Sequence, residues 1–312
     1  MSVRRRTLLT ITAATGVGAA ALGAERMLDR SPTGTPTRVQ GAADGRAPRA
    51  PDEPFAVGVR EFSWLREGRP LLTRIWYPAI GTPGSDPVTE ALIADGRFPV
   101  VAFSHGMRTT PESYLSLILP LAAAGFVVTA PDFPDNTADA VTDGTRPKDL
   151  SEVVSLTLAL NAAPGDPFNG HLDDRNGIGA AGHSLGGMTT HALLTDWRDE
   201  RIAAAALLAA FEVGDPAGAP VNVLFVHGAA DPTADYAVAR RMYEETAWPK
   251  AFLTHLDQGH DEYVYEDGAT YPQTRDALVD WMRWSLYADP TARDRLRADA
   301  TSDGTAWESA LD

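Results

Sequence analysis

The sequence of 312 residues contains no cysteine. Disulfides, thiol catalysis and cysteine-ligated zinc are therefore excluded. A chain of this length buries enough apolar surface to fold without such cross-links, and its 44% hydrophobic and 22% charged residues are ordinary for a globular protein. No pattern typical of a cofactor or a metal site stands out, so we expect neither group.

Long hydrophobic runs and basic residues are also scarce. Beyond the N-terminus no stretch is apolar for about 18 residues, so we expect no internal membrane span. Lys and Arg number 27 against 42 Asp and Glu, which gives a net charge of −15. An acidic surface repels nucleic acid and anionic lipid, so a nucleic-acid partner is not expected. A neutral substrate fits this charge better than a polyanion. We expect a monomer.

The N-terminal segment, residues 1–24, is typical of an export signal. A run of arginines precedes a weakly apolar stretch, with small residues that allow cleavage after Ala21 or Ala24. Arg5-Arg6-Thr7-Leu8-Leu9 is typical of a bacterial twin-arginine signal. We therefore expect an exported protein, extracellular or in the cell envelope. Retention of the segment as a membrane anchor is the alternative.

From residue 53 to residue 290, apolar runs alternate with helical patterns. Continuous apolar runs predict strands buried on both faces; they cover residues 98–103, 125–130, 177–181 and 221–226. Residues 71–77 alternate apolar and polar side chains and predict an antiparallel strand near a sheet edge. Helical patterns cover residues 112–124, 147–160, 188–194 and 236–245. This alternation predicts an α/β fold with a mostly parallel central sheet and helices on both faces.

Three further segments have little apolar content. Residues 25–52, rich in Pro, Gly, Ala and Arg, predict a flexible linker. Residues 291–312 are acidic and predict a partly ordered tail after the catalytic domain of residues 53–290. Residues 131–146 carry several aspartates and predict a solvated loop that could border an acyl pocket; binding of a calcium ion is the alternative.

Gly182-His183-Ser184-Leu185-Gly186 joins a buried strand to a helix. In that context the G-x-S-x-G pattern predicts a nucleophile elbow, a tight turn that exposes the serine hydroxyl. Glycines are needed where side chains would collide across the turn. The helix N-terminus favours negative charge that develops at the site. We therefore interpret Ser184 as a nucleophile rather than as a buried turn serine.

A serine hydroxyl needs a base to react at neutral pH. His260 lies in a loop after a strand and follows Ser184 in the chain, which is the order typical of this elbow, so it is the predicted base. His255 is interpreted as a packed or edge residue of that strand. We expect His183 to point away from the nucleophile and His227 to end its own strand.

The carboxylate that orients the base is expected after the preceding strand, residues 221–226. Asp231 lies in the turn that follows this strand and is the predicted acid. Asp235 and Glu212 are alternatives, and Asp231 before Pro232 is also typical of a helix cap.

Ester hydrolysis also needs two backbone N–H groups to bind the oxyanion. We expect one from Leu185, the residue after the nucleophile, and the other from Met107. Gly106 allows the backbone to turn inward at that loop. His105 is interpreted as bracing the loop through a hydrogen bond rather than as a base. The aromatic residues Phe133, Tyr263 and Tyr265 either line a cleft or pack in the core.

Several motifs together resemble one family of bacterial esterases, related to platelet-activating-factor acetylhydrolase and to cutinase-like polyester hydrolases. They are Ile75-Trp76-Tyr77-Pro78, Phe103-Ser104-His105-Gly106, Gly125-Phe126-Val127-Val128, Arg146-Pro147-Lys148-Asp149-Leu150, Gly182-His183-Ser184-Leu185-Gly186-Gly187, His227-Gly228-Ala229-Ala230-Asp231 and Gly259-His260. The resemblance implies the α/β-hydrolase fold, a triad of Ser184, Asp231 and His260, and an oxyanion hole formed by Met107 and Leu185.

These residues predict a serine hydrolase that cleaves carboxylic esters through an acyl-enzyme. The substrate would be a small-molecule, lipid or polymer ester. The Trp-Tyr-Pro and Arg-Pro-x-Asp-Leu blocks fit the acetylhydrolase side of the family better, and the C-terminal disulfide frequent in cutinase-like enzymes is missing. The same triad also serves acyl transfer and peptide cleavage. A non-enzymatic binding module would require a broken triad, and none of the three residues is missing.

Overall fold

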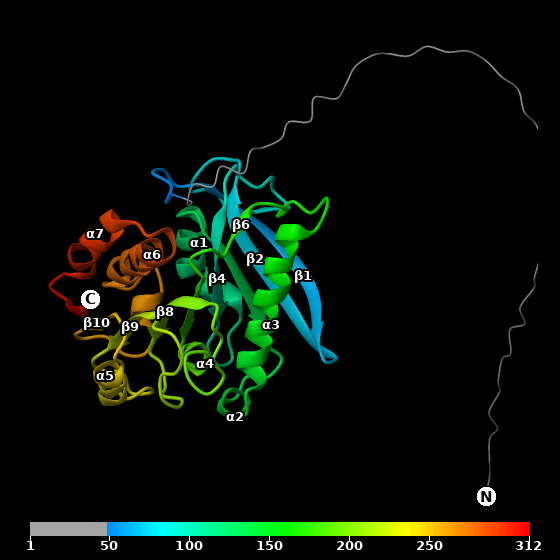
Figure 1. The fold of residues 1–312 in the computed structure, drawn as a ribbon. Coiled ribbons are helices and arrows are strands. Elements are labelled where there is room, and N and C mark those ends of the chain that lie inside the picture. The colour runs from blue at the N-terminus through cyan, green and yellow to red at the C-terminus, as the bar shows by residue number, and fades with distance from the viewer. Residues whose placement is uncertain (1–48) are drawn as a thin grey trace, which may run out of the picture. The chain divides into compact units, whose positions relative to one another are not determined.

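The computed structural model describes residues 49–312. The predicted export signal and most of the predicted linker lie outside the described residues. Six neighbouring strands of the described part form a parallel core, in the spatial order β5 (Val127–Asp132), β4 (Phe98–Ser104), β7 (Ile178–His183), β8 (Ile202–Leu208), β9 (Asn222–Gly228) and β10 (Lys250–His255). Figure 1 shows these strands side by side between the helices.

Antiparallel strands flank this parallel core. At one side β2 (Arg69–Ala79) pairs with β5, and β1 (Ala56–Arg66) pairs with β2. At the other side β11 (Thr305–Ala310) pairs with β10. Two short strands, β3 (Val88–Thr89) and β6 (Leu172–Asp173), pair in parallel with β1 and β4. The predicted sheet, mostly parallel with an antiparallel strand over residues 71–77, is confirmed.

Helices cover both faces of the sheet. One face carries α1 (Leu115–Ala123), which follows the short 3₁₀ turn Pro111–Tyr114, and α6 (Tyr271–Tyr287) with α7 (Pro290–Ala300) packed on it. The other face carries α3 (Thr145–Ala159) and α5 (Tyr236–Glu245). Two further 3₁₀ turns span Leu160–Ala162 and Glu262–Val264. Helices on both faces leave the strand ends as the accessible part of the sheet.

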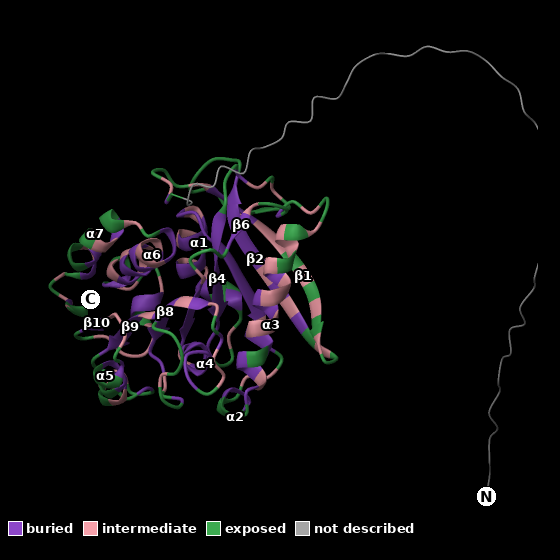
Figure 2. Cartoon of the chain, viewed as in Figure 1, coloured by how far each residue is buried: buried purple, intermediate pink, exposed green. Residues whose placement is uncertain are grey.

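Successive residues of each central strand pack on opposite faces. In β4, Val101 and Phe103 belong to the cluster that contains α1 and α6, whereas Val100 and Ala102 belong to the cluster that contains α3 and α5. This is the two-residue period of a strand, with both faces apolar because both are covered. Figure 2 shows the central strands buried, whereas β1 near the sheet edge is partly exposed.

The helix α4 (Leu185–Ala192) follows β7 and is buried along its whole length. It packs with α2 (Ala138–Thr142) in a small separate cluster of apolar residues. The short helix α2 lies inside residues 131–146, which the sequence predicted as a solvated loop. Buried Ala140 and Val141 explain the difference, because two apolar side chains suffice to hold one helical turn against α4.

The expected acidic tail over residues 291–312 is instead the helix α7 and the edge strand β11. The buried apolar residues of α7, Ala292, Leu296 and Ala300, are spaced four apart, and the helix packs against α6. An ion pair at 2.6 Å between Arg295 and Asp280 joins the two helices. Low apolar content therefore does not indicate a loose segment when the apolar residues share one face.

The last residues of the predicted linker also pack on the domain. Ala50 is buried in the core, and the carbonyl of Pro51 accepts a hydrogen bond from Arg283 at 3.1 Å. Ala50 and Pro51 therefore belong to the folded domain, although the predicted boundary is at residue 53.

We predict that deletion of residues 301–312 destabilises the protein, because it removes β11 and leaves the edge of β10 unpaired. The melting temperature should fall by at least about 5 °C, and light scattering should detect association through the exposed edge. Glu308→Gln, which keeps the strand, is the control. A truncated chain with unchanged melting temperature and no association would mean that the segment is a tail after all.

Candidate active site

The turn between β7 and α4 has the geometry of a nucleophile elbow. Ser184 adopts φ 55° and ψ −120°, a conformation that L-residues rarely adopt. The turn is tight because the backbone on either side makes close contact. A Cβ on Gly182 would lie 2.3 Å from the carbonyl oxygen of Gly186, and one on Gly186 would lie 1.8 Å from that of Ser104. Only glycine fits at both positions, as the sequence predicted.

The structure brings together the three side chains that the sequence singled out. His260 Nε2 lies 2.8 Å from Ser184 Oγ, and His260 Nδ1 lies 2.8 Å from Asp231 Oδ2. The three residues follow β7, β9 and β10 at the carboxyl end of the sheet. Because a carboxylate only accepts, Nδ1 carries the proton and Nε2 accepts from the serine hydroxyl. The arrangement can therefore remove a proton from Ser184.

Asp231 is held by several donors at once. Its Oδ1 accepts the N–H groups of Thr233 and Ala234, at 2.7 and 2.9 Å. Burial raises the pKa of Asp231, but the hydrogen bonds from His260 and from these two N–H groups outweigh it, so the pKa is lowered and the group is ionised at neutral pH. Asp231 does not cap a helix, because α5 begins at Tyr236 and its cap is Asp235; the two N–H groups that it binds belong to the turn before that helix.

The alternative acids have other partners. Asp235 caps α5, where its side chain accepts from the N–H of Ala237 at 2.9 Å. Glu212 forms an ion pair with Arg241 at the rim of the site. Neither carboxylate contacts His260 within the described residues, so Asp231 is the acid that the fold places at the base.

The loops of the acid and the base touch through their backbones. A Cβ on Gly228 would lie 2.0 Å from the carbonyl oxygen of Gly259, and the N–H of Ala230 donates to the carbonyl of Gln258 at 3.0 Å. This close approach requires glycine at residue 228 and holds the turn of Asp231 against the loop of His260.

The two residues predicted to bind an oxyanion, Met107 and Leu185, both line the cleft that contains Ser184. The N–H of Leu185 begins α4 and has no acceptor within its own helix. The N–H of Met107 shares a peptide group with the carbonyl of Gly106. That carbonyl accepts hydrogen bonds from His105 Nδ1 at 2.8 Å and from Thr109 Oγ1 at 2.9 Å. Because the peptide is planar and trans, the Met107 N–H points away from both donors. It has no acceptor among residues 49–312, and Met107 and Leu185 both line the cleft.

His105 braces this loop, as the sequence predicted. Its Nε2 accepts the N–H of Phe133 at 3.1 Å, which leaves the proton on Nδ1 to bind the Gly106 carbonyl. Burial, aided by the charge of Arg146, lowers the pKa of His105 to about 4. The ring is therefore neutral near pH 7 and keeps the tautomer that the loop requires.

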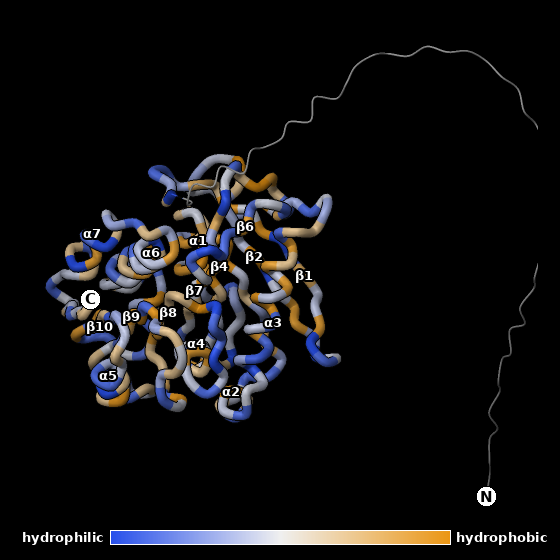
Figure 3. Tube along the Cα trace, viewed as in Figure 1, coloured by the Kyte–Doolittle hydropathy of each residue, from blue (hydrophilic) through white to orange (hydrophobic). Residues whose placement is uncertain are grey.

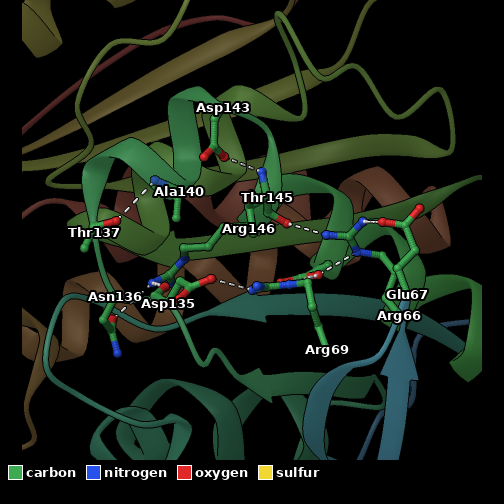
Figure 4. A network of polar contacts seen from close by, with 11 residues as sticks. Arg66, Glu67, Arg69, Asp135, Asn136, Thr137, Ala140, Asp143, Thr145 and Arg146 are labelled. Atoms are coloured by element: carbon green, nitrogen blue, oxygen red, sulfur yellow. Dashed lines mark hydrogen bonds and ion pairs between the residues drawn. The ribbon is translucent and has the colours of Figure 1, made fainter.

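Arg146, for which the sequence predicted no role, holds the same loop through a hydrogen bond to its backbone. It is fully buried, and its guanidinium donates to the carbonyl of His105 at 2.8 Å and to Asn136 at 3.1 Å. In Figure 4 Arg146 reaches Asn136, while Arg66 and Arg69 come from the turn between β1 and β2, a turn that is hydrophilic in Figure 3. The Arg-Pro-x-Asp-Leu block was the available signal for this role.

The buried carboxylate of that block, Asp149, explains why the β1–β2 turn docks on α3. Its oxygens accept from Arg66 Nε at 2.6 Å and from Arg69 at 3.0 Å, and Arg69 also pairs with Asp135 at 2.7 Å. Two cations thus compensate one buried anion. The ion-pair network fixes the first turn of α3, from which Arg146 extends.

Ser184 lies in an open cleft of about 650 Å³. Besides Ser184 and His260, its walls include Met107, Leu185, Met188, Phe211 and Tyr265. Ala138 also lines it, so residues 131–146 border the cleft as expected. Of the predicted aromatics only Tyr265 lines it; Phe133 and Tyr263 are buried in packing.

Among residues 49–312 no cluster of His, Asp and Glu could hold a metal ion. None of the helices in this part of the chain has the length and apolar character that a membrane span requires.

The chain resembles one known family over part of its length. A family model described as Chlorophyllase matches residues 86–220. This is an esterase family of the α/β-hydrolase type, related to the acetylhydrolase-like and cutinase-like enzymes, so the resemblance and the α/β-hydrolase fold are confirmed. The match contains Ser184 and Met107 and ends before Asp231 and His260. It indicates an ester-acting hydrolase. No curated protein matches the chain significantly.

Burial of neutral histidines predicts acid lability. Burial lowers the pKa of His105, His183 and His191 to about 4 and that of His255 to about 3, whereas histidine in an unfolded chain titrates near 6.5. Between these values the unfolded state binds more protons, so stability is complete above about pH 6.5 and is lost as the pH falls towards 4. Each histidine contributes a slope of up to about 1.4 kcal/mol per pH unit.

Urea unfolding at pH 7.5, 6 and 5 measures this slope. Burial raises the pKa of Asp280 to about 6, so this one carboxyl group makes the protein more stable as the pH falls, opposite to the histidines. His255→Gln should reduce the slope by the equivalent of about one proton. A free energy of unfolding that stays constant between pH 7 and 5 would show that the buried histidines take up protons in the folded state as readily as in the unfolded chain.

Proposed function

We propose that the protein is a serine hydrolase that cleaves carboxylic esters through an acyl-enzyme. Ser184 is the nucleophile, His260 the general base and Asp231 the acid that orients it. The observation that carries the proposal is the continuous hydrogen-bonded path from Ser184 Oγ through His260 to Asp231, with both contacts at 2.8 Å, in a cleft that accommodates a substrate.

In the acylation step His260 Nε2 takes the hydroxyl proton as Ser184 Oγ attacks the ester carbonyl. Charge then builds on the carbonyl oxygen, which the N–H groups of Met107 and Leu185 stabilise, aided by the N-terminus of α4. Ionised Asp231 holds the tautomer of His260 and stabilises its positive charge. The protonated base next gives its proton to the departing alcohol.

In the deacylation step water enters the open cleft and His260 removes its proton. The hydroxide adds to the acyl carbonyl, the same two N–H groups bind the oxyanion, and Ser184 leaves with the proton from His260. The acid is released, and the enzyme returns to its starting state without a cofactor.

The walls of the cleft favour an ester with an apolar group. Met107, Leu185, Met188 and Phe211 offer flexible or aromatic surface beside the nucleophile. The protein's acidic net charge favours neutral substrates. Nitrophenyl esters of increasing acyl length, a polyester film and chlorophyll, suggested by the name of the matched family, form a suitable substrate panel.

Ser184→Ala tests the proposal directly. Wild-type protein should react with a fluorophosphonate probe and release nitrophenol from short acyl esters, whereas the variant should not label and should lose at least about 10⁴-fold in kcat. Because Ser184 is the only attacking group, no other hydroxyl replaces it.

Ser113→Ala, at an exposed serine outside the cleft, is the matched control and should retain labelling and turnover. Wild-type protein that neither labels nor hydrolyses any ester of the panel would refute the proposal. Unchanged labelling of Ser184→Ala would assign the nucleophile elsewhere.

We also propose that the protein is exported through the twin-arginine route, on the strength of Arg5-Arg6-Thr7-Leu8-Leu9 and the apolar stretch after it. Replacing Arg5 and Arg6 with lysine should retain the protein in the cytoplasm of a bacterial host, measured by fractionation and immunoblotting. Arg46→Lys, outside the signal, is the control. Equal export of the twin-lysine variant would reject this route.

A further inference from the structure

A second path of hydrogen bonds joins residues that line the cleft and is not used by the proposed chemistry. The Gly106 N–H lies 3.1 Å from the hydroxyl of Tyr114. That hydroxyl lies 3.0 Å from His183 Nδ1, and His183 Nε2 lies 2.8 Å from the backbone carbonyl of His260. The side chains of Tyr114 and His183 are almost fully buried.

The direction of every proton on this path is determined. The carbonyl of His260 can only accept, so His183 carries its proton on Nε2. Burial lowers the pKa of His183 to about 4, so the ring is neutral and Nδ1 is an acceptor. Tyr114, whose pKa burial raises to about 12, remains protonated and donates to Nδ1. Its oxygen is then free to accept the Gly106 N–H.

The path joins three parts of the site that lie far apart in the sequence. Gly106 precedes the oxyanion donor Met107, His183 precedes Ser184, and His260 is the base itself. The contacts are also close: a Cβ on Gly106 would lie 2.6 Å from the Tyr114 hydroxyl. The rings of His183 and His260 are 4.9 Å apart. The path therefore connects the backbone of Gly106 to the backbone of His260.

We propose that Tyr114 and His183 are positioning residues that couple the oxyanion loop to the base loop through one directed path of hydrogen bonds. The proposal rests on the proposed hydrolase function and deepens it. The path sets the separation between the oxyanion donor at Met107 and the base at His260, on which stabilisation of the transition state depends. Neither side chain transfers a proton to the substrate.

Tyr114→Phe removes the hydroxyl but keeps the ring, so it interrupts the path at its centre. We expect kcat for a short nitrophenyl ester to fall by about 10- to 100-fold while KM changes less than about twofold. The matched control is Tyr77→Phe. Tyr77 is also buried and donates to a backbone carbonyl, that of Ala91, at 2.7 Å, but it lies outside the cleft. It should lose comparable thermal stability and keep its kcat.

A double-mutant cycle tests the coupling. His183→Gln keeps an amide donor for the His260 carbonyl but removes the acceptor of Tyr114. If the residues act as one path, the double variant Tyr114→Phe/His183→Gln should be about as slow as the slower single variant. Multiplication of the two effects, or a kcat of Tyr114→Phe within twofold of that of the wild type, would overturn the proposal. Should Tyr114→Phe fail to fold, a kcat of His183→Gln within twofold of that of Tyr77→Phe would also overturn it.

Nitrogen-15 NMR of histidine-labelled protein at pH 7 provides a readout that needs no turnover. The His183 signals, assigned by their loss in His183→Gln, should show a protonated Nε2 and an unprotonated, hydrogen-bonded Nδ1. The Nδ1 signal should shift in Tyr114→Phe and not in Tyr77→Phe. A proton on Nδ1 would overturn the path. Wild-type protein that shows the predicted signals but hydrolyses no ester would instead refute the hydrolase function.

Discussion

The site depends on one close backbone contact, between the end of β4 and the first turn of α4. Gly186 lies so near the carbonyl of Ser104 that a Cβ would stand 1.8 Å from its oxygen. This contact holds the loop that follows β4 against the elbow and helps to keep Ser184 at φ 55°, a conformation that costs about 1–3 kcal/mol. Strands on both sides of β7 supply the support, because the N–H of Ser184 also donates to the carbonyl of Leu208 at 2.9 Å.

Much of this arrangement was predictable because its signals are local. A continuous apolar run such as residues 98–103 indicates a strand covered on both faces. Small residues around Ser184 indicate a turn too tight for side chains. Chain order and position after a strand then singled out Asp231 and His260, which the structure places at hydrogen-bonding distance. Their catalytic roles remain proposals, with a geometry that supports them.

Other features could not be predicted, because they depend on tertiary contacts that no local pattern reveals. The helix α7 and the strand β11 have few apolar residues and are stabilised by α6 and β10. Arg146 lies in a polar segment of the sequence, which predicts an exposed side chain. It is buried instead, and its guanidinium donates a hydrogen bond to the carbonyl of His105. The role of His183 likewise depends on Tyr114 and His260, 69 and 77 residues away along the chain.

Position in the chain singled out His260 among the histidines, but its environment is what makes it suitable as a base. His183, His227 and His255 are buried with their ring nitrogens held by hydroxyl or carbonyl groups. His260 differs in two respects: its side chain remains 18% exposed in the cleft, and its Nδ1 lies 2.8 Å from Asp231 Oδ2, closer than the 3.3 Å between that oxygen and His227 Nε2. A base needs both, because access lets it reach the substrate and the carboxylate stabilises the charge that it acquires. The other rings are buried, and burial lowers the pKa of each one, so they stay neutral near pH 7. A neutral ring keeps one donor and one acceptor nitrogen, which fixes the hydrogen bonds that it forms.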